Sequence, residues 1–242
     1  MSFSRWDRAR KTKQSFVFKK IKNIIYCTKY MNKIRNIIFD YGNVIFTIDF
    51  IRAQHSFTEL GVKNIENFFS HKGHDSLFDQ FEQGLISSSE FRDGIRKVTG
   101  IKSLSDAEID KAWNSLLIGV PEPNHDLLLK VKEKYRTFLL SNNNEIHYNW
   151  IMDYLQREHR LDSNAVFFEK DYYSHLMKMR KPNREIFEFV MRENNLNPKE
   201  TLFIDDSPQH LKTADMLGLN THLLTADETL ESYLYDSGLL SR

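Results

Sequence analysis

Short strand-like runs recur along the chain with helical patterns between them, and this alternation is the feature that most restricts the fold. The first run covers residues 37–39, and the later ones cover 137–140, 165–168, 201–204 and 220–224. Most of these runs have no polar face, which is typical of parallel strands buried on both sides. The sequence therefore predicts an α/β fold: a doubly wound parallel sheet with right-handed crossover helices.

The alternation stops between residues 51 and 124, where the pattern is helical and no convincing strand is visible. Two capping-box signatures, Ser87-x-x-Glu90 and Ser105-x-x-Glu108, each open a segment with apolar residues at helical spacing. We therefore expect an all-helical module inserted after the first strand.

Length and charge divide the chain further. A chain of 242 residues is long enough for one domain and a small inserted one. Residues 1–36 hold 11 Lys and Arg but only one acid, whereas the rest of the chain holds 23 basic and 32 acidic side chains. We predict three parts: a basic N-terminal extension over 1–35, a core domain from 36–50 and 122–242, and a helical cap domain over 51–121.

Three interpretations of the basic extension stay open. Clustered Lys and Arg bind nucleic acid or anionic membranes, and an Arg-rich, acid-poor segment is also typical of an organelle transit peptide. Alternatively, Met31 is the natural start and the stretch before it is an upstream extension of the reading frame. Met31 lies only six residues before the first strand, which favours this last interpretation, so we do not expect a nucleic-acid partner.

Cysteine content and hydropathy indicate the compartment. Cys27 is the only cysteine, which excludes an internal disulfide and a thiolate cluster for zinc. No run approaches the roughly 18 apolar residues that a membrane-spanning helix needs. We therefore expect a cytoplasmic protein without a membrane partner.

Polar side chains directly follow three of the predicted strands. Asp40 follows the first, Ser141 and Asn142 follow the second, and Asp205 and Asp206 follow the fourth. In a doubly wound sheet the ligand lies beyond the carboxyl ends of the strands, near the switch point. Each residue alone could be a helix cap or a turn residue, but together they predict a site at this edge.

A lysine completes a pattern that resembles a known family. Lys181 lies in a loop before a helix whose first turn is marked by Pro182. Four stretches then resemble the four motifs of haloacid dehalogenase-like (HAD) hydrolases: residues 37–44 (IIFDYGNV), 139–142 (LLSN), 180–182 (RKP) and 202–207 (LFIDDS). The resemblance runs over about residues 36–225. Residues 81–86 (FEQGLI) are similar to cap helices of the phosphatase branch, and within it the chain most resembles the sugar-phosphate phosphatases typified by α-D-glucose-1-phosphatase.

The resemblance implies hydrolysis of a small phosphorylated metabolite, such as a sugar phosphate. Asp40 would attack phosphorus and form an aspartyl-phosphate, which splits hydrolysis into two easier displacements. Ser141, Asn142 and Lys181 would bind the phosphoryl oxygens as charge develops in the transition state. Asp40, Ser141 and Lys181 are therefore the expected catalytic residues.

The resemblance also implies a Mg²⁺ site. Its ligands would be the carboxylates of Asp40, Asp205 and Asp206 and the backbone carbonyl of Gly42. Mg²⁺ takes hard oxygen ligands and commonly uses one or two carboxylates together with the substrate phosphate. Three carboxylates are balanced by one Mg²⁺ and the Lys181 ammonium.

One position departs from the family pattern. Most phosphatases of this kind place a second Asp two residues after the nucleophile as general acid and base, and Gly42 stands there instead. General acid–base help is typically worth about 10² to 10⁴ in rate. Either a histidine replaces it, with His147 and His210 as candidates, or the leaving group departs unaided.

Two alternative functions stay open. A 2-haloacid dehalogenase also lacks the second Asp, but its chemistry needs no metal. Without a cation, the adjacent Asp205 and Asp206 would repel the ionised form of Asp40, which argues against this function. A weakly active binding protein of the same fold is the other alternative. Leaving-group specificity is expected from cap residues near Phe50, Phe78 and Trp113.

Overall fold

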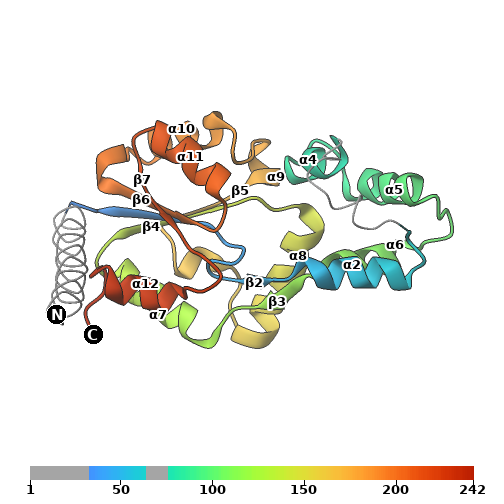
Figure 1. Ribbon diagram of the computed structural model, residues 1–242, viewed down its shortest axis with the longest axis horizontal. Helices are drawn as coiled ribbons and strands as arrows, with labels where there is room; N and C mark the ends of the chain where they lie inside the picture. The colour runs from blue at the N-terminus through green and yellow to red at the C-terminus, as the bar shows by residue number, and fades with distance from the viewer. Residues whose placement is uncertain (1–32, 64–75) are drawn as a thin grey trace, which may run out of the picture.

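The computed structural model describes residues 33–63 and 76–242, so the predicted basic extension lies almost wholly outside the described residues. Five strands form the central sheet in the order β5-β4-β1-β6-β7 (Figure 1). They are β1 Asn36–Phe39, β4 Arg136–Ser141, β5 Lys170–Tyr173, β6 Thr201–Asp205 and β7 Asn220–Leu223. All four pairings are parallel, and the strand order reverses at β1. The doubly wound sheet is confirmed, with its switch point at the carboxyl end of β1.

Helices cover both faces of the sheet, which explains why its strands lack a polar face. Ile37 and Phe39 of β1 join one apolar layer and Ile38 joins the other, because successive side chains of a strand point to opposite faces. One face is covered by α7 (Glu122–Lys132) and α12 (Leu230–Asp236), the other by α10 (Arg184–Glu193) and α11 (Pro208–Met216) (Figure 1). The remaining connections contain α8 (Glu145–Tyr154), the π-helix η2 (Leu155–His159), α9 (Ser174–Met177) and the short 3₁₀ helix η4 (Pro198–Glu200).

Within the described part of the chain, four helices between β1 and β4 extend away from the sheet (Figure 1). They are α2 (Phe50–Glu59), α4 (Ser76–Glu82), α5 (Ser88–Thr99) and α6 (Asp106–Asn114), and we call them the helical lobe. Both predicted capping boxes are present, at the starts of α5 and α6. In each, the serine side chain accepts from the backbone of the glutamate three residues on, and that glutamate accepts from the serine backbone.

Two short strands were not expected. β2 (Thr47–Ile48) and β3 (Leu117–Gly119) pair antiparallel where the chain enters and leaves the helical lobe. The expectation that residues 51–124 contain no strand is therefore wrong at β3. Two or three residues are too few to show the alternation that marks a strand in sequence.

The predicted strand over 165–168 is also wrong. Residues Asn164–Val166 form a 3₁₀ helix, η3, and the strand of the sheet is β5, which begins at Lys170. Phe167 and Phe168 are buried against the sheet from this turn, so their hydrophobicity reflects packing rather than strand pairing. β5 pairs only with β4 and lies at the edge of the sheet, which allows it the polar residues Lys170 and Asp171.

Candidate active site

Three carboxylates converge at the switch point of the sheet. Asp40 follows β1, Asp205 ends β6, and Asp206 follows it. The backbone N–H of Asp40 donates to the Ile204 carbonyl at 2.9 Å, which joins the two strand ends. One carboxylate oxygen from each aspartate lies within 4.8 Å of the others, so one cation could contact all three.

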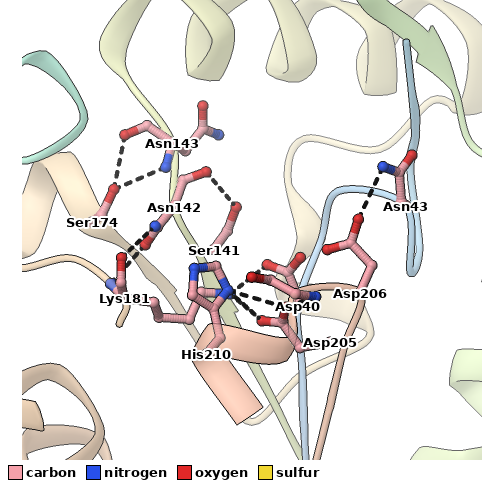
Figure 2. Close-up of polar contacts among 11 residues, drawn as sticks. Asp40, Asn43, Ser141, Asn142, Asn143, Ser174, Lys181, Asp205, Asp206 and His210 are labelled. Atoms are coloured by element: carbon pink, nitrogen blue, oxygen red, sulfur yellow. Dashed lines mark hydrogen bonds and ion pairs between the residues drawn. The ribbon is translucent and has the colours of Figure 1, made fainter. Parts of the chain in front are cut away.

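The Lys181 ammonium lies between two of these carboxylates (Figure 2). Its Nζ is 2.6 Å from Oδ1 of Asp40 and 2.8 Å from Oδ2 of Asp205. The side chain is fully buried. Burial alone would lower the pKa of this lysine, but the two carboxylates outweigh it and raise the pKa above its ordinary value. Lys181 is therefore a permanent positive charge in the site.

The three aspartates differ in how easily they ionise. Burial raises the pKa of Asp40 to about 7, against the opposing effect of Lys181. Asp205 is also buried, but Lys181 and His210 hold its pKa below the ordinary value. Burial also raises the pKa of Asp206, although a hydrogen bond from Asn43 opposes this rise. Asp205 is therefore the aspartate that ionises most easily, and a further cation would stabilise the ionised forms of Asp40 and Asp206.

Ser141 and Asn142 lie at the end of β4, beside β1, as predicted. The Ser141 side chain is buried, and its hydroxyl donates a long hydrogen bond of 3.3 Å to the Asn142 carbonyl. The Asn142 side chain instead fixes the lysine segment: its Nδ2 donates to the Lys181 carbonyl at 2.8 Å, and its Oδ1 accepts from the Lys181 N–H at 2.9 Å. The hydroxyl thus remains available to a ligand, and the amide holds the lysine backbone in place.

Asn43 is a site residue that sequence reasoning missed. Its Nδ2 donates to Oδ2 of Asp206 at 3.0 Å, and its Oδ1 accepts from the Ile48 N–H at 3.1 Å. Its φ of 55° lies in the left-handed region, which asparagine tolerates better than most residues. Asn43 therefore orients Asp206 from the loop after β1. The Gly-Asn pair in a turn was the signal for it.

Gly42 lies beside Ile48 in the turn that follows Asp40. A Cβ at this position would lie 3.0 Å from Cδ1 of Ile48, the flexible end of a side chain. The backbone of Gly42 is not in the left-handed region, so a side chain here is not excluded by φ. The backbone conformation at residue 42 therefore does not require glycine.

The two candidate histidines differ in their surroundings. His147 is buried; its Nδ1 is 3.0 Å from Asn144 Nδ2 and its Nε2 is 3.2 Å from the Trp113 carbonyl. Burial lowers the pKa of His147 to about 4, so the ring is neutral at pH 7, with both nitrogens bonded. His210 Nδ1 lies 3.0 Å from both carboxylate oxygens of Asp205 (Figure 2). His147 is thus unsuited to protonate a leaving group, and His210 remains the candidate.

The three predicted lobe residues do not form one group. Phe78 and Trp113 pack together, with ring centroids 5.3 Å apart, and Trp113 stacks on His147 at 4.7 Å. This aromatic contact joins α6 of the lobe to α8 of the core. Phe50 begins α2 and is 51% exposed.

Comparisons with known proteins show to which family the chain belongs. A family profile described as haloacid dehalogenase-like hydrolase matches residues 34–218. The chain belongs to this family of hydrolases, and the predictions of its fold class and of hydrolase activity are confirmed.

Individual relatives narrow the comparison. The D-ribitol-5-phosphate phosphatase of Bacteroides thetaiotaomicron is 30% identical over 190 residues, which are 78% of this chain and 90% of the relative. A HAD family enzyme from the same organism, solved with magnesium and inorganic phosphate, has a TM-score of 0.73 and 44% identity over 81% of this chain and 96% of that one. A HAD-like hydrolase from Porphyromonas gingivalis has a TM-score of 0.69 and 33% identity, over 79% and 91% of the two chains.

Proposed function

We propose that this chain is a Mg²⁺-dependent phosphatase that hydrolyses a small sugar or polyol phosphate through an aspartyl-phosphate on Asp40. The observation that carries the proposal is the pairing of a three-carboxylate cluster with one fully buried lysine at the switch point of the sheet. The similarity to a D-ribitol-5-phosphate phosphatase, and to an enzyme solved with magnesium and phosphate, supports it.

The donor set suits Mg²⁺. Three carboxylates and one ammonium carry two net negative charges, which a divalent cation cancels. Asp40, Asp206 and the Gly42 carbonyl would hold the ion together with Asp205, all through hard oxygen atoms. When bound, Mg²⁺ would supply positive charge to the phosphoryl oxygens and to the ionised form of Asp40.

The chain's own residues would perform the phosphoryl transfer. An oxygen of Asp40 forms a bond to phosphorus while the bond from phosphorus to the ester oxygen breaks, and the departing alkoxide takes a proton. Lys181, the Ser141 hydroxyl and the Asn142 N–H would stabilise charge on the three phosphoryl oxygens. Water then attacks phosphorus and gives a proton back to the group that protonated the alkoxide, and phosphate leaves with regeneration of the Asp40 carboxylate.

His210 is our candidate for the proton on the leaving alkoxide. Gly42 offers no carboxyl group, and His147 is neutral and bonded at both ring nitrogens. His210 contacts the cluster through Asp205 and is only 13% exposed. An acid at this place would allow alkyl phosphates, which have poor leaving groups, to remain substrates.

The dehalogenase alternative accounts less well for the charges. Its chemistry needs no metal, yet burial raises the pKa of Asp40, and the carboxylates of Asp205 and Asp206 add to this rise. A binding protein of the same fold would need no nucleophile held 2.6 Å from a buried lysine. We therefore favour the phosphatase.

A phosphate-release assay tests the proposal directly. The purified protein is assayed with ribitol 5-phosphate, glucose 1-phosphate and p-nitrophenyl phosphate, in Mg²⁺ and in EDTA. We expect release that EDTA abolishes and Mg²⁺ restores. Chloride release from 2-chloropropionate that is indifferent to EDTA would favour the dehalogenase, and phosphate binding without turnover would favour the binding protein.

We also propose that the reaction takes place in the cytoplasm, on a free metabolite. The single cysteine supports a reducing compartment. Among the described residues, 33–63 and 76–242, no helix combines the length and the hydropathy needed to cross a membrane.

A further inference from the structure

Helix α4 of the lobe docks on the core segment that leads from β5 to Lys181. The contacts that join α4 and the turn after it to this segment include Arg180 to Asp79, Arg180 to Glu82, Ser174 to the Glu82 carbonyl and Lys178 to the Gly84 carbonyl. The backbones approach closely, since a Cβ at Gly84 would lie 2.2 Å from the His175 carbonyl oxygen. The lobe therefore meets the core immediately beside the catalytic lysine.

Arg180 carries most of the charge at this contact. Its Nη1 is 2.6 Å from Oδ1 of Asp79, and its Nη2 is 2.7 Å from Oε2 of Glu82. The three side chains are 19%, 30% and 28% exposed, so water screens these ion pairs less than it would at the surface. Asp79 and Glu82 lie three residues apart on one helix face, and without the arginine they would repel each other.

The Ser174 hydroxyl connects the same helix to the loop that follows β4. It is fully buried, accepts from the Asn143 N–H at 2.8 Å, and has two carbonyls in reach: Glu82 at 2.6 Å and Asn143 at 2.9 Å. A hydroxyl has one proton, so it donates to one carbonyl at a time. If α4 moved away, the proton could turn to the Asn143 carbonyl and stay bonded. This hydroxyl therefore opposes undocking only weakly, and the two ion pairs of Arg180 oppose it more strongly.

We propose that Arg180 is a positioning residue that clamps α4 of the helical lobe over the active site, so that the lobe encloses the leaving group of the substrate. This inference rests on the proposed function. Asn142 fixes both backbone groups of Lys181 independently, so loss of the Arg180 side chain acts on the lobe rather than on the lysine. The effect should then grow with the part of the substrate that the lobe has to enclose.

The test compares Arg180→Ala with Arg184→Ala, a matched control whose side chain makes an exposed i,i+4 ion pair with Glu188 on α10. We expect Arg180→Ala to lower kcat/KM for ribitol 5-phosphate at least tenfold, and to lower it several-fold less for acetyl phosphate, whose leaving group is small. Hydrogen–deuterium exchange of α4 should accelerate at least fivefold in Arg180→Ala and stay as in the wild type in Arg184→Ala.

Two lobe variants keep the test valid if Arg180→Ala fails to fold. Asp79→Asn and Glu82→Gln keep the side-chain shape and each remove one partner, so each should loosen α4 in exchange. The combination of Arg180→Ala with Glu82→Gln should lose less activity than the product of the two single losses, because both changes remove the same ion pair. Arg180→Lys should recover part of the loss.

The outcomes separate this inference from the proposed function. A wild-type protein that releases no phosphate from any ester overturns the proposed function, whereas exchange of α4, measured with Mg²⁺ and inorganic phosphate present, still reports on the clamp. Unchanged α4 exchange in Arg180→Ala, Asp79→Asn and Glu82→Gln would overturn the clamp. Equal losses on ribitol 5-phosphate and acetyl phosphate would also overturn it, because they would show that Arg180 acts on phosphoryl transfer itself.

Discussion

The two sides of the active site are built on different principles. On the sheet side, charges from separate strands and loops are paired at short distance, as in the contacts of Lys181 with Asp40 and Asp205. On the lobe side the groups include apolar or neutral ones, such as Ile48, Trp113 and a neutral His147, and the charges of Arg180, Asp79 and Glu82 pair where α4 docks. In the proposed reaction, phosphoryl transfer would take place on the sheet side, and the lobe side would enclose the rest of the substrate.

The largest expected effect is on the sheet side. Asp40→Asn should lower kcat by about 10³-fold or more, because an amide of the same shape cannot attack phosphorus. Its carbonyl oxygen can still accept from Lys181, so the fold should stay intact by circular dichroism. Phosphatase activity within tenfold of the wild type, in a metal-replete sample, would contradict the assignment of Asp40 as nucleophile.

The contrast between the two sides also explains what could be predicted from the sequence. Asp40, Ser141 and Asp205 each stand at the end of an apolar strand, and a parallel sheet brings strand ends to one edge whatever the loops do. These positions follow from the alternation of strands and helices alone. The roles assigned to them stay predictions until the variants are measured.

Other features depend on tertiary contacts that leave no local pattern. The run at 165–168 is apolar because Phe167 and Phe168 pack under the sheet, and the real strand, β5, is more polar because it lies at the edge. His147 could be judged only once its bonds to Asn144 and the Trp113 carbonyl were visible. Asn43 reaches Asp206 across 163 residues of sequence.

A second variant tests whether Asp205 and Asp206 differ in their contribution to Mg²⁺ binding. Asp205 is fully buried and binds Lys181, His210 and the Ser207 N–H, whereas Asp206 is partly exposed and accepts a hydrogen bond from Asn43. Asp206→Asn should raise the Mg²⁺ concentration for half-maximal activity by about 10- to 100-fold, since conservative changes near a metal cost that much in affinity. The exposed Asp215→Asn on α11 serves as control. An unchanged Mg²⁺ requirement would remove Asp206 from the ligand set.

A third experiment adds a carboxyl group at residue 42. In Gly42→Asp, Ile48 has to yield by a few tenths of an ångström, and the new carboxyl group can serve as general acid. We expect kcat/KM to rise more for alkyl phosphates than for aryl phosphates. The rise should be smaller than the roughly 10² to 10⁴ that an optimised general acid contributes. The slope of log kcat/KM against leaving-group pKa should become shallower.

His210→Gln is the complementary change. It should slow ribitol 5-phosphate about tenfold or more and slow p-nitrophenyl phosphate much less, because p-nitrophenolate leaves without protonation. His147→Gln should not reproduce this pattern. If His210→Gln slows both esters equally, His210 supports Asp205 and the leaving group finds its proton elsewhere.

The smallest effect concerns stability rather than rate, and it follows from the raised pKa of Asp40. A pKa of about 7 in the fold against an ordinary value of 3.8 means that the folded state binds this proton more tightly than the unfolded chain. The resulting stabilisation is complete below pH 3.8 and is lost as pH rises through 7. Asp205 has the opposite shift, so its stabilising contribution is already present above its ordinary pKa and changes little from pH 5.5 to 8.

Mg²⁺ competes with the Asp40 proton at pH 5.5 and finds an ionised carboxylate at pH 8. Saturating Mg²⁺ should therefore raise Tm by about 5 °C or more at pH 8 and by clearly less at pH 5.5, and Asp40→Asn should flatten this difference. A Mg²⁺ shift that is equal at both pH values in the wild type would show that Asp40 does not contribute its charge to the metal site.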